Sequence, residues 1–280
     1  MKLEWSHFRL NFSKKSYIMG VLNVTPDSFS DGGLFFDKGR AVEHAFRMVE
    51  DGADILDIGG ESTRPGSDPV SLEEELRRTL PVIEAIAEAV KVPVSIDTYK
   101  AEVARRALDA GASLVNDISG LRFDPGMPKL VAERRVPVVL MHIKGNPKDM
   151  QKNPEYEALI PEVMEYLRIS ILLALKSGIP ENMILIDPGI GFGKTASHNL
   201  EIIRNLQEFT RLGKPLVMGV SRKAFLGKIL DDAPATDRLE GTAAAVAVSL
   251  LNGAHIVRVH DVKEMARVAK VVDAIKRGSV

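Results

Sequence analysis

The sequence predicts an α/β fold, a TIM or (β/α)₈ barrel that forms one domain over residues 1–280 with a short N-terminal plug segment. Three observations predict it: eight short apolar runs, helical patterns between them, and a length of 280 residues. Short β-branched runs that alternate with helical patterns are typical of βα units in a parallel sheet. Eight such units favour a closed barrel, which typically takes about 250 residues. A doubly wound open sheet is the alternative, because pattern alone does not prove closure.

The expected strands are short and rich in β-branched residues. They cover residues 18–24, 54–58, 94–97, 114–116, 137–141, 183–187, 215–218 and 255–259. Five of them follow a Gly-Ala or X-Pro pair, which suits the turns between a helix and the next strand at the bottom of a barrel. The first 17 residues are expected to form an irregular or hairpin plug at that end.

Helices are expected where apolar residues recur with a period of 3.6. The ranges are 72–90, 161–176, 200–209, 239–251 and 262–275. The first helix should begin after Ser71, because Glu74 three residues later completes the pattern of a capping box. No linker rich in Pro, Ser or charge divides the chain, so we expect a single domain.

The composition excludes several classes of protein. The 37 basic residues are balanced by 38 acidic ones, so the chain lacks the basic excess typical of nucleic-acid binding. The absence of cysteine excludes disulfide scaffolds, thiol catalysis and Cys-based metal sites. The longest apolar stretch, residues 243–251, is far shorter than the roughly 18 residues of a membrane span. Charges in the first 11 residues do not fit a signal peptide, so we expect a cytoplasmic protein with no membrane or nucleic-acid partner.

Polar side chains collect where the expected strands end, which in such a barrel is the face that carries the active site. They are Asn23; Asp57, followed by Thr63 and Arg64; Asp97; Asn116; Met141 and His142; Asp187; Ser221, Arg222 and Lys223; and Arg258 with His260. Two acids, an amide and a lysine suit a heterocycle with several N–H donors and a carbonyl. Two arginines and a histidine suit phosphate.

Each of these residues also has a plainer structural interpretation. Asp97 could cap the next helix, and Asp187 could serve a Pro-Gly turn. Lys223 could be a solvated lysine, although the helix dipole disfavours lysine at a helix start. His142 is interpreted as a packed histidine rather than a ligand. The convergence of eight strand ends on one mouth favours a functional site.

Familiar catalytic motifs are missing from the chain. Residues 189–195 end like a phosphate-binding P-loop, but the first glycine of that motif would fall on Pro188. There is no HExxH, no GxSxG and no histidine cluster with metal-ligand spacing. Two Gly-rich loops, 25–33 and 59–67, follow the first two strands, and loops of this kind at a catalytic face favour closure over a ligand.

Two long segments carry a family resemblance. Residues 19–33 (MGVLNVTPDSFSDGG) and 57–66 (DIGGESTRPG) resemble the first and second signatures of bacterial dihydropteroate synthases. Shorter matches follow in order: Asp97-Thr98, Asn116-Asp117-Ile118, Leu140-Met141-His142, Asp187-Pro188-Gly189, Gly191-Phe192-Gly193-Lys194, Ser221-Arg222-Lys223 and Arg258-Val259-His260-Asp261. The resemblance extends from about residue 18 to the C-terminus.

The resemblance implies an activity and a set of site residues. The activity is condensation of 6-hydroxymethyl-7,8-dihydropterin diphosphate with 4-aminobenzoate, a step of folate synthesis, by a homodimeric TIM barrel with Mg²⁺. Asp97, Asn116, Asp187 and Lys223 would bind the pterin edge; Ile118, Met141, Phe192 and Gly219 would pack against its faces; Arg64, Arg258 and His260 would bind the diphosphate; Asn23 would bind Mg²⁺; Thr63, Phe29 and Pro65 lie in the two loops that would complete the aminobenzoate pocket. Lys223, Asp97, Arg258 and Arg64 would serve catalysis.

This chemistry needs no catalytic triad, because an arylamine is neutral at pH 7 and can attack without a general base. Positioning and electrostatic stabilisation of the leaving diphosphate are what remains for the protein to supply. One departure is Ala224, which stands where some relatives carry a Ser that receives the aminobenzoate carboxylate. A backbone N–H at the start of the helix could replace that hydroxyl.

Two other functions fit the same residues less well. The pterin-binding barrel of corrinoid-dependent methyltransferases has no diphosphate to bind, so Arg64 and the pair Arg258 and His260 argue against it. A non-catalytic pterin-binding relative is disfavoured because every matched polar position is filled.

Overall fold

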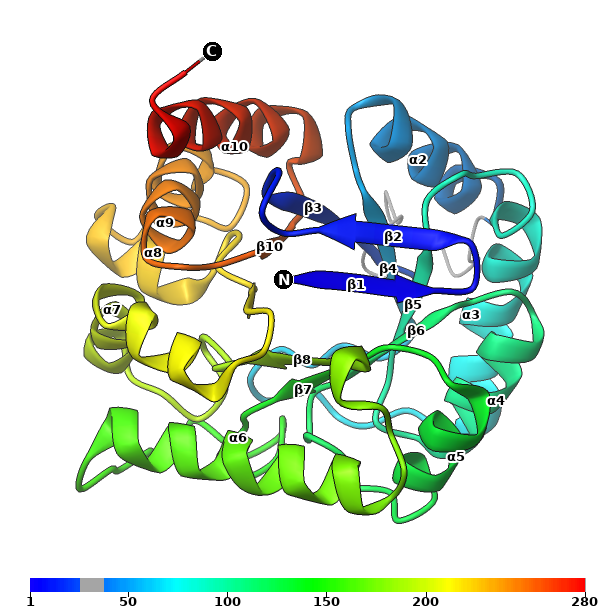
Figure 1. The fold of residues 1–280 in the computed structure, drawn as a ribbon. Helices are drawn as coiled ribbons and strands as arrows, with labels where there is room; N and C mark the ends of the chain where they lie inside the picture. The colour runs from blue at the N-terminus through cyan, green and yellow to red at the C-terminus, as the bar shows by residue number, and fades with distance from the viewer. Residues whose placement is uncertain (26–37, 280) are drawn as a thin grey trace.

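The computed structural model describes residues 1–25 and 38–279, and its centre is an eight-stranded parallel sheet. The strands are β3 (Tyr17–Asn23), β4 (Ile55–Gly59), β5 (Val94–Asp97), β6 (Leu114–Asp117), β7 (Val138–Met141), β8 (Ile184–Asp187), β9 (Val217–Met218) and β10 (Ile256–Val259). They pair in the order β8-β7-β6-β5-β4-β3-β10-β9. A parallel bridge between Ile186 and Leu216 joins the two ends of this order, so the sheet closes (Figure 1). The predicted TIM barrel and its eight strands are confirmed.

Helices follow the strands along the chain and form the outer layer of the barrel (Figure 1). They are α2 (Lys38–Glu50), α3 (Leu72–Ile86), α4 (Ala101–Asp109), α5 (Met127–Arg134), α6 (Leu159–Lys176), α7 (Ala196–Arg204), α8 (Ala224–Ile229), α9 (Leu239–Leu251) and α10 (Val262–Arg277), with 3₁₀ segments η1 (Glu181–Met183) and η2 (Leu206–Leu212). The strands are covered on both faces, which is why they consist of nearly continuous apolar runs. Within the described residues, no helix combines the length and apolar character needed to cross a bilayer.

Local signals explain where two of the helices begin and end. The Ser71 side chain accepts a hydrogen bond from the Glu74 backbone N–H, so the predicted cap of α3 is confirmed. The helix ends at Ile86 rather than at residue 90, although Val90 still donates to the Ile86 carbonyl in a frayed last turn.

The prediction of one helix over residues 200–209 was wrong. Helix α7 begins earlier, because Thr195 caps it in a reciprocal capping box with His198. It ends at Arg204, where Asn205 turns its side chain back onto the Glu201 carbonyl, and the chain continues as the 3₁₀ segment η2.

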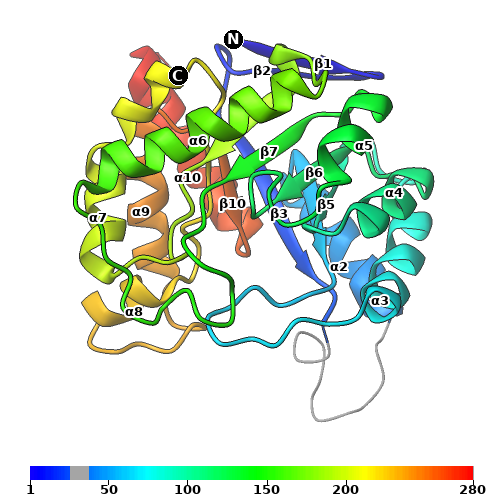
Figure 2. The same cartoon turned by 90° about the horizontal axis from the view of Figure 1, so that it is seen from below.

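The N-terminal residues form the expected plug as an antiparallel hairpin of β1 (Lys2–Trp5) and β2 (Phe8–Asn11). Its buried side chains Leu3, Trp5 and Leu10 pack on apolar residues that the barrel strands point inward, including Met19 and Leu185. Figure 2 shows the hairpin at one end of the barrel and the long loops that follow β4 and β7 at the other. One end of the barrel is therefore filled with apolar side chains, and polar chemistry is left to the opposite end.

Candidate active site

Four neighbouring strands place one residue each in a single row at the mouth of the barrel. The parallel registers pair Asn23 with Gly59, Gly59 with Asp97, and Asp97 with Asn116. Gly59 keeps the row open, because a Cβ there would lie 3.5 Å from Asp97 Oδ2 and 3.8 Å from Asn23 Oδ1. Three of the predicted site residues are thus brought together by strand register alone.

Arg258 forms the electrostatic centre of this mouth. Its Nε lies 2.6 Å from Asp57 Oδ2 and its Nη2 lies 2.7 Å from Asp97 Oδ2. Asn116 Nδ2 also donates to Asp57 Oδ2, at 3.0 Å. We call Asp57, Asp97 and Arg258 the arginine–carboxylate triad. The third guanidinium nitrogen of Arg258, Nη1, has no hydrogen bond to the residues that the structure describes.

Two carboxylate oxygens of the triad lack a partner. Asp57 Oδ1 and Asp97 Oδ1 are buried and accept no hydrogen bond from the described part of the chain. A buried acceptor without a donor costs free energy, so such an atom in a cavity marks a place for a ligand N–H. Burial, reinforced by the Asp57 charge, raises the pKa of Asp97 to about 7 although Arg258 opposes the shift.

Asp187 and Lys223 lie across the mouth from this row. Asp187 Oδ1 accepts a 2.7 Å hydrogen bond from Gly189 N, so the acid does serve its Pro-Gly turn, and burial raises its pKa to about 6. Burial and the nearby Arg258 lower the pKa of Lys223 to about 8. The Lys223 ammonium lies 4.4 Å from the centre of the Phe192 ring, with which it makes a cation–π contact.

An apolar wall stands beside these polar groups. Ile118, Met141 and Phe192 are buried in one cluster with Ile143 and Met150, and Tyr99 packs against it. Gly219 has nothing within 4 Å of the position where a Cβ would stand, so it borders open space. A flat apolar wall beside hydrogen-bonding groups suits a planar heterocycle.

His260 is part of a local network with Ser221. The Ser221 hydroxyl accepts from the His260 backbone N–H at 3.2 Å and lies 3.0 Å from His260 Nδ1. Burial and the charges of Arg258 and Arg222 lower the pKa of His260 to about 3. The ring is therefore neutral at physiological pH, so His260 adds no positive charge to the mouth.

The loop of residues 60–71 after β4 is tied down at its base and carries three predicted site residues at its tip. Buried Glu61 accepts hydrogen bonds from Val70 N, Tyr99 Oη and Lys100 Nζ. Thr63 is half-buried, whereas Arg64 and Pro65 are exposed. Phe29, in the loop after β3, lies outside the described residues.

Comparison with known proteins decides the family. The sequence pattern of a family described as pterin binding enzyme matches residues 19–260. A dihydropteroate synthase of Synechocystis sp. is 50% identical over 267 residues, which cover 95% of this chain and 92% of that protein. The chain belongs to the dihydropteroate synthase family of pterin-binding enzymes.

Solved dihydropteroate synthases share the whole fold. The structure from Yersinia pestis, in complex with a sulfonamide drug, has a TM-score of 0.94 and 42% identity and covers 99% of this chain and 100% of its own. That from Xanthomonas albilineans in complex with 7,8-dihydropteroate has a TM-score of 0.89 and 39% identity, with 99% coverage of both chains. The resemblance read from the motifs is confirmed at the level of the family.

The sequence did not predict the places of two residues near the mouth. Asp57 was noted at a strand end, but its position between Arg258 and Asn116 was not foreseen. An acid inside an otherwise apolar strand was the available signal, since a buried carboxylate needs a partner. The alternative role of Asp97 as a helix cap is not found, because Lys100 occupies the cap position of α4.

His142 is a packed residue, as interpreted. It is 4% exposed, its Nδ1 lies 2.8 Å from the buried Lys194 Nζ, and its ring contacts Tyr166 edge-on. The pKa of both groups is lowered, chiefly by burial. Lys194, the last residue of the Gly191-Phe192-Gly193-Lys194 motif, is the second residue whose place the sequence did not predict.

Proposed function

We propose that this protein condenses 6-hydroxymethyl-7,8-dihydropterin diphosphate with 4-aminobenzoate, forming 7,8-dihydropteroate and releasing pyrophosphate in folate synthesis. The observation that carries the proposal is the buried, unpaired Asp97 Oδ1 beside Asn116 at the mouth. It supplies an acceptor where the N–H groups of a pterin would lie. Membership of the dihydropteroate synthase family supports the same reaction.

The pterin ring would be held at its edge and on one face. Asp97 and Asp187 would accept hydrogen bonds from ring N–H and amino groups, while the Lys223 ammonium would donate to the ring carbonyl. Asn116 Nδ2 donates a hydrogen bond to Asp57, so the amide oxygen of Asn116 would accept a hydrogen bond from the ligand. The wall of Ile118, Met141 and Phe192 would pack against the ring face.

The reacting bond joins the pterin methylene carbon to the diphosphate oxygen. As that bond breaks, its electron pair stays on the diphosphate oxygen. The negative charge there would be stabilised by Arg258 Nη1, His260 Nε2 and Arg64, and the electron-rich pterin would stabilise the cationic carbon. The 4-aminobenzoate nitrogen then forms the new bond to that carbon, and its surplus proton passes to water. No group of the protein has to act as a base, because the arylamine attacks in its neutral form.

Mg²⁺ would be held jointly by Asn23 and the diphosphate. Asn23 lies in the same row as Asp97, and its amide oxygen is a suitable ligand for Mg²⁺. The described residues contain no group of three acids or histidines suited to a metal, which fits an ion carried mainly by substrate phosphates and water. When bound, the ion would supply positive charge beside the leaving diphosphate.

We further propose that the protein acts as a homodimer in the cytoplasm. The adjacent helices α9 and α10 expose Val248, Leu251, Val271 and Ile275, and a second copy of the chain packed on these helices would bury them. The negatively charged diphosphate substrate does not cross membranes unaided, which favours the cytoplasm.

An assay of pyrophosphate release tests the function. We expect Mg²⁺-dependent release only when both the dihydropterin diphosphate and 4-aminobenzoate are present. Release at a comparable rate without the arylamine would contradict a synthase. Pterin binding without any release would indicate a non-catalytic relative, and tight binding of methyl-tetrahydrofolate would favour the methyltransferase alternative.

A further inference from the structure

The turn of residues 188–195 after β8 is tied to the loop of residues 142–158 after β7 by an unusual set of hydrogen bonds. Three successive backbone carbonyls of the turn each accept a hydrogen bond from a side chain. The bonds are Gln151 Nε2 to Gly191 O at 2.6 Å, Lys194 Nζ to Phe192 O at 3.1 Å and Tyr156 Oη to Gly193 O at 2.7 Å. We call these three donors the carbonyl clasp.

Lys194 connects the clasp to the neighbouring strand. Its side chain is 2% exposed, and the same Nζ that bonds Phe192 O lies 2.8 Å from His142 Nδ1. His142 directly follows the last residue of β7. At this distance a single proton lies between Lys194 Nζ and His142 Nδ1, so the two side chains are hydrogen-bonded to each other. The lysine thereby links the turn to the barrel itself.

The turn is packed closely against the start of the loop after β7. Gly189 and Gly193 both have left-handed backbone angles, with φ of +72° and +65°. A Cβ at Gly189 would lie 1.9 Å from His142 O, and one at Gly193 would lie 2.5 Å from Lys144 O. Only glycine fits at either position. The two backbones are in direct contact on both sides of Phe192.

Phe192 is the residue whose placement depends on these contacts. Its ring belongs to the apolar wall of the mouth and lies 4.4 Å from the Lys223 ammonium. The backbone of Phe192 sets the direction of that ring, so the bond from Lys194 to its carbonyl and the bonds to the two flanking carbonyls set the position of the wall. None of the three donors belongs to the wall itself.

We propose that Gln151, Tyr156 and Lys194 are positioning residues for the pterin, because they hold the Phe192 ring at the height and angle at which it supports both the pterin face and Lys223. This inference rests on the proposed function. It makes the loop after β7 part of the pterin site without contact between that loop's clasp side chains and the ligand.

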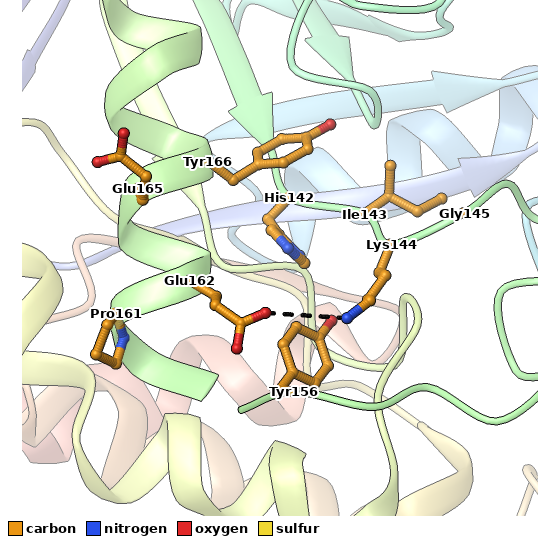
Figure 3. Close-up of a pocket in the computed structure, with 9 residues that line it drawn as sticks. All are labelled: His142, Ile143, Lys144, Gly145, Tyr156, Pro161, Glu162, Glu165 and Tyr166. Carbon is orange, nitrogen blue, oxygen red and sulfur yellow. Dashed lines mark ion pairs between the residues drawn. The ribbon is translucent and has the colours of Figure 1, made fainter. Parts of the chain in front are cut away.

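Tyr156 and Gln151 can be substituted without disturbing the mouth of the barrel. A pocket of about 610 Å³ is lined by Tyr156, His142, Lys144 and Tyr166 (Figure 3). Tyr156 can lose its hydroxyl on this side without filling the mouth of the barrel. Gln151 is exposed, so its replacement leaves the core intact.

The experiment compares Gln151→Ala, Tyr156→Phe and Lys194→Met with the unaltered protein by calorimetric titration of 6-hydroxymethylpterin. One lost hydrogen bond corresponds to a roughly three- to tenfold rise in Kd, which we expect for Gln151→Ala and Tyr156→Phe. Lys194→Met should exceed about tenfold, because it also leaves His142 Nδ1 and Phe192 O unpaired in a buried place. The thermal midpoint of Gln151→Ala should stay close to that of the unaltered protein, since Gln151 is exposed.

The matched control is Lys214→Met. Lys214 is also a buried lysine, 5% exposed, and it bonds Glu181 at 2.7 Å near the N-terminal hairpin end of the barrel. Its loss should lower the thermal midpoint and leave the pterin Kd unchanged.

Two results would overturn the inference. One is a pterin Kd within twofold of the unaltered protein in both Gln151→Ala and Tyr156→Phe, which decides the matter even if Lys194→Met does not fold. The other is a fall in the thermal midpoint of Gln151→Ala as large as that of Lys214→Met, which would indicate general loosening. Failure of the unaltered protein to bind pterin would instead contradict the proposed function.

Discussion

At the scale of single residues, the mouth of the barrel depends on a few buried charges. In the proposed site, Asp97 and Asp187 would each accept hydrogen bonds from the pterin, which the apolar side chains of the wall cannot do. Asp97→Ala and Asp187→Ala should each weaken pterin binding by about 1.5–3 kcal/mol, the cost of a hydrogen bond to a charged group. Calorimetry with a pterin measures the loss, and thermal unfolding shows that the variants fold. Unchanged affinity in both would place the pterin elsewhere.

The pKa values of the same groups predict how pterin affinity depends on pH. Burial raises the pKa of Asp97 to about 7 and that of Asp187 to about 6, so lowering the pH through this range protonates the acceptors and weakens binding. Lys223 has its pKa lowered to about 8 by burial, so raising the pH above 8 removes the donor for the ring carbonyl. Affinity should therefore peak between about pH 7 and 8. A titration series from pH 5 to pH 9 that stayed flat would contradict these roles.

Arg258 pairs with two acids, and its Nη1 is the atom that we propose binds the diphosphate. Arg258→Ala should lower pyrophosphate affinity and turnover together, with a rate loss on the order of 10²–10³ for one electrostatic contact. Arg258→Lys is the control, since it keeps the charge and loses the forked geometry. Wild-type values for both affinity and turnover in the alanine variant would show that the diphosphate binds elsewhere.

At the scale of elements, one prediction concerns the loops that follow β3 and β4. Arg64 and Pro65 stand at the exposed tip of a loop whose base is fixed by Glu61, and Asn23 ends the preceding strand. We expect both loops to close once pyrophosphate and Mg²⁺ give Arg64 and Asn23 an anionic partner. Closure would complete the slot for the benzene ring of 4-aminobenzoate.

Arylsulfonamides resemble 4-aminobenzoate and should bind well only to the protein loaded with pyrophosphate. Calorimetric titration with and without pyrophosphate measures the difference. Substitutions that reshape the slot at Phe29 or Pro65 should weaken sulfonamides more than the substrate, if the drug protrudes further from the slot. Equal sulfonamide affinity in both states would mean that the pocket is preformed.

The sequence could predict contacts that follow from strand register, but it could not predict contacts between residues far apart in the chain. Strands buried on both faces are apolar runs, and strand register then places Asn23, Asp97 and Asn116 side by side without further information. The bond from Arg258 to Asp57 joins residues 201 positions apart, and no local pattern encodes it. The Lys194 and His142 contact, across 52 positions, depends on two loops meeting at glycines that admit no Cβ.

At the scale of the whole molecule, the predicted barrel and its plug account for the division of chemistry between the two ends. Apolar side chains of the strands pack under the hairpin at one end, whereas acids, amides and cations converge at the other. The sequence predicted this polarity because it follows from the order of strand and helix. It could not predict which cation pairs with which acid, since several pairings satisfy the same spacing.

The hairpin has a kinetic consequence. A barrel that is filled at one end has a single entrance, so both substrates enter and both products leave by the same route. The residues proposed to bind the pterin lie at the ends of the buried strands, whereas Arg64 and Pro65 are exposed on the loop after β4, so an arylamine bound at that loop would block the pterin's path. Binding should therefore be sequential, with the pterin diphosphate first and 4-aminobenzoate second. Product inhibition patterns measured against each substrate in turn reveal that order, and random addition would mean that the pterin has another way in.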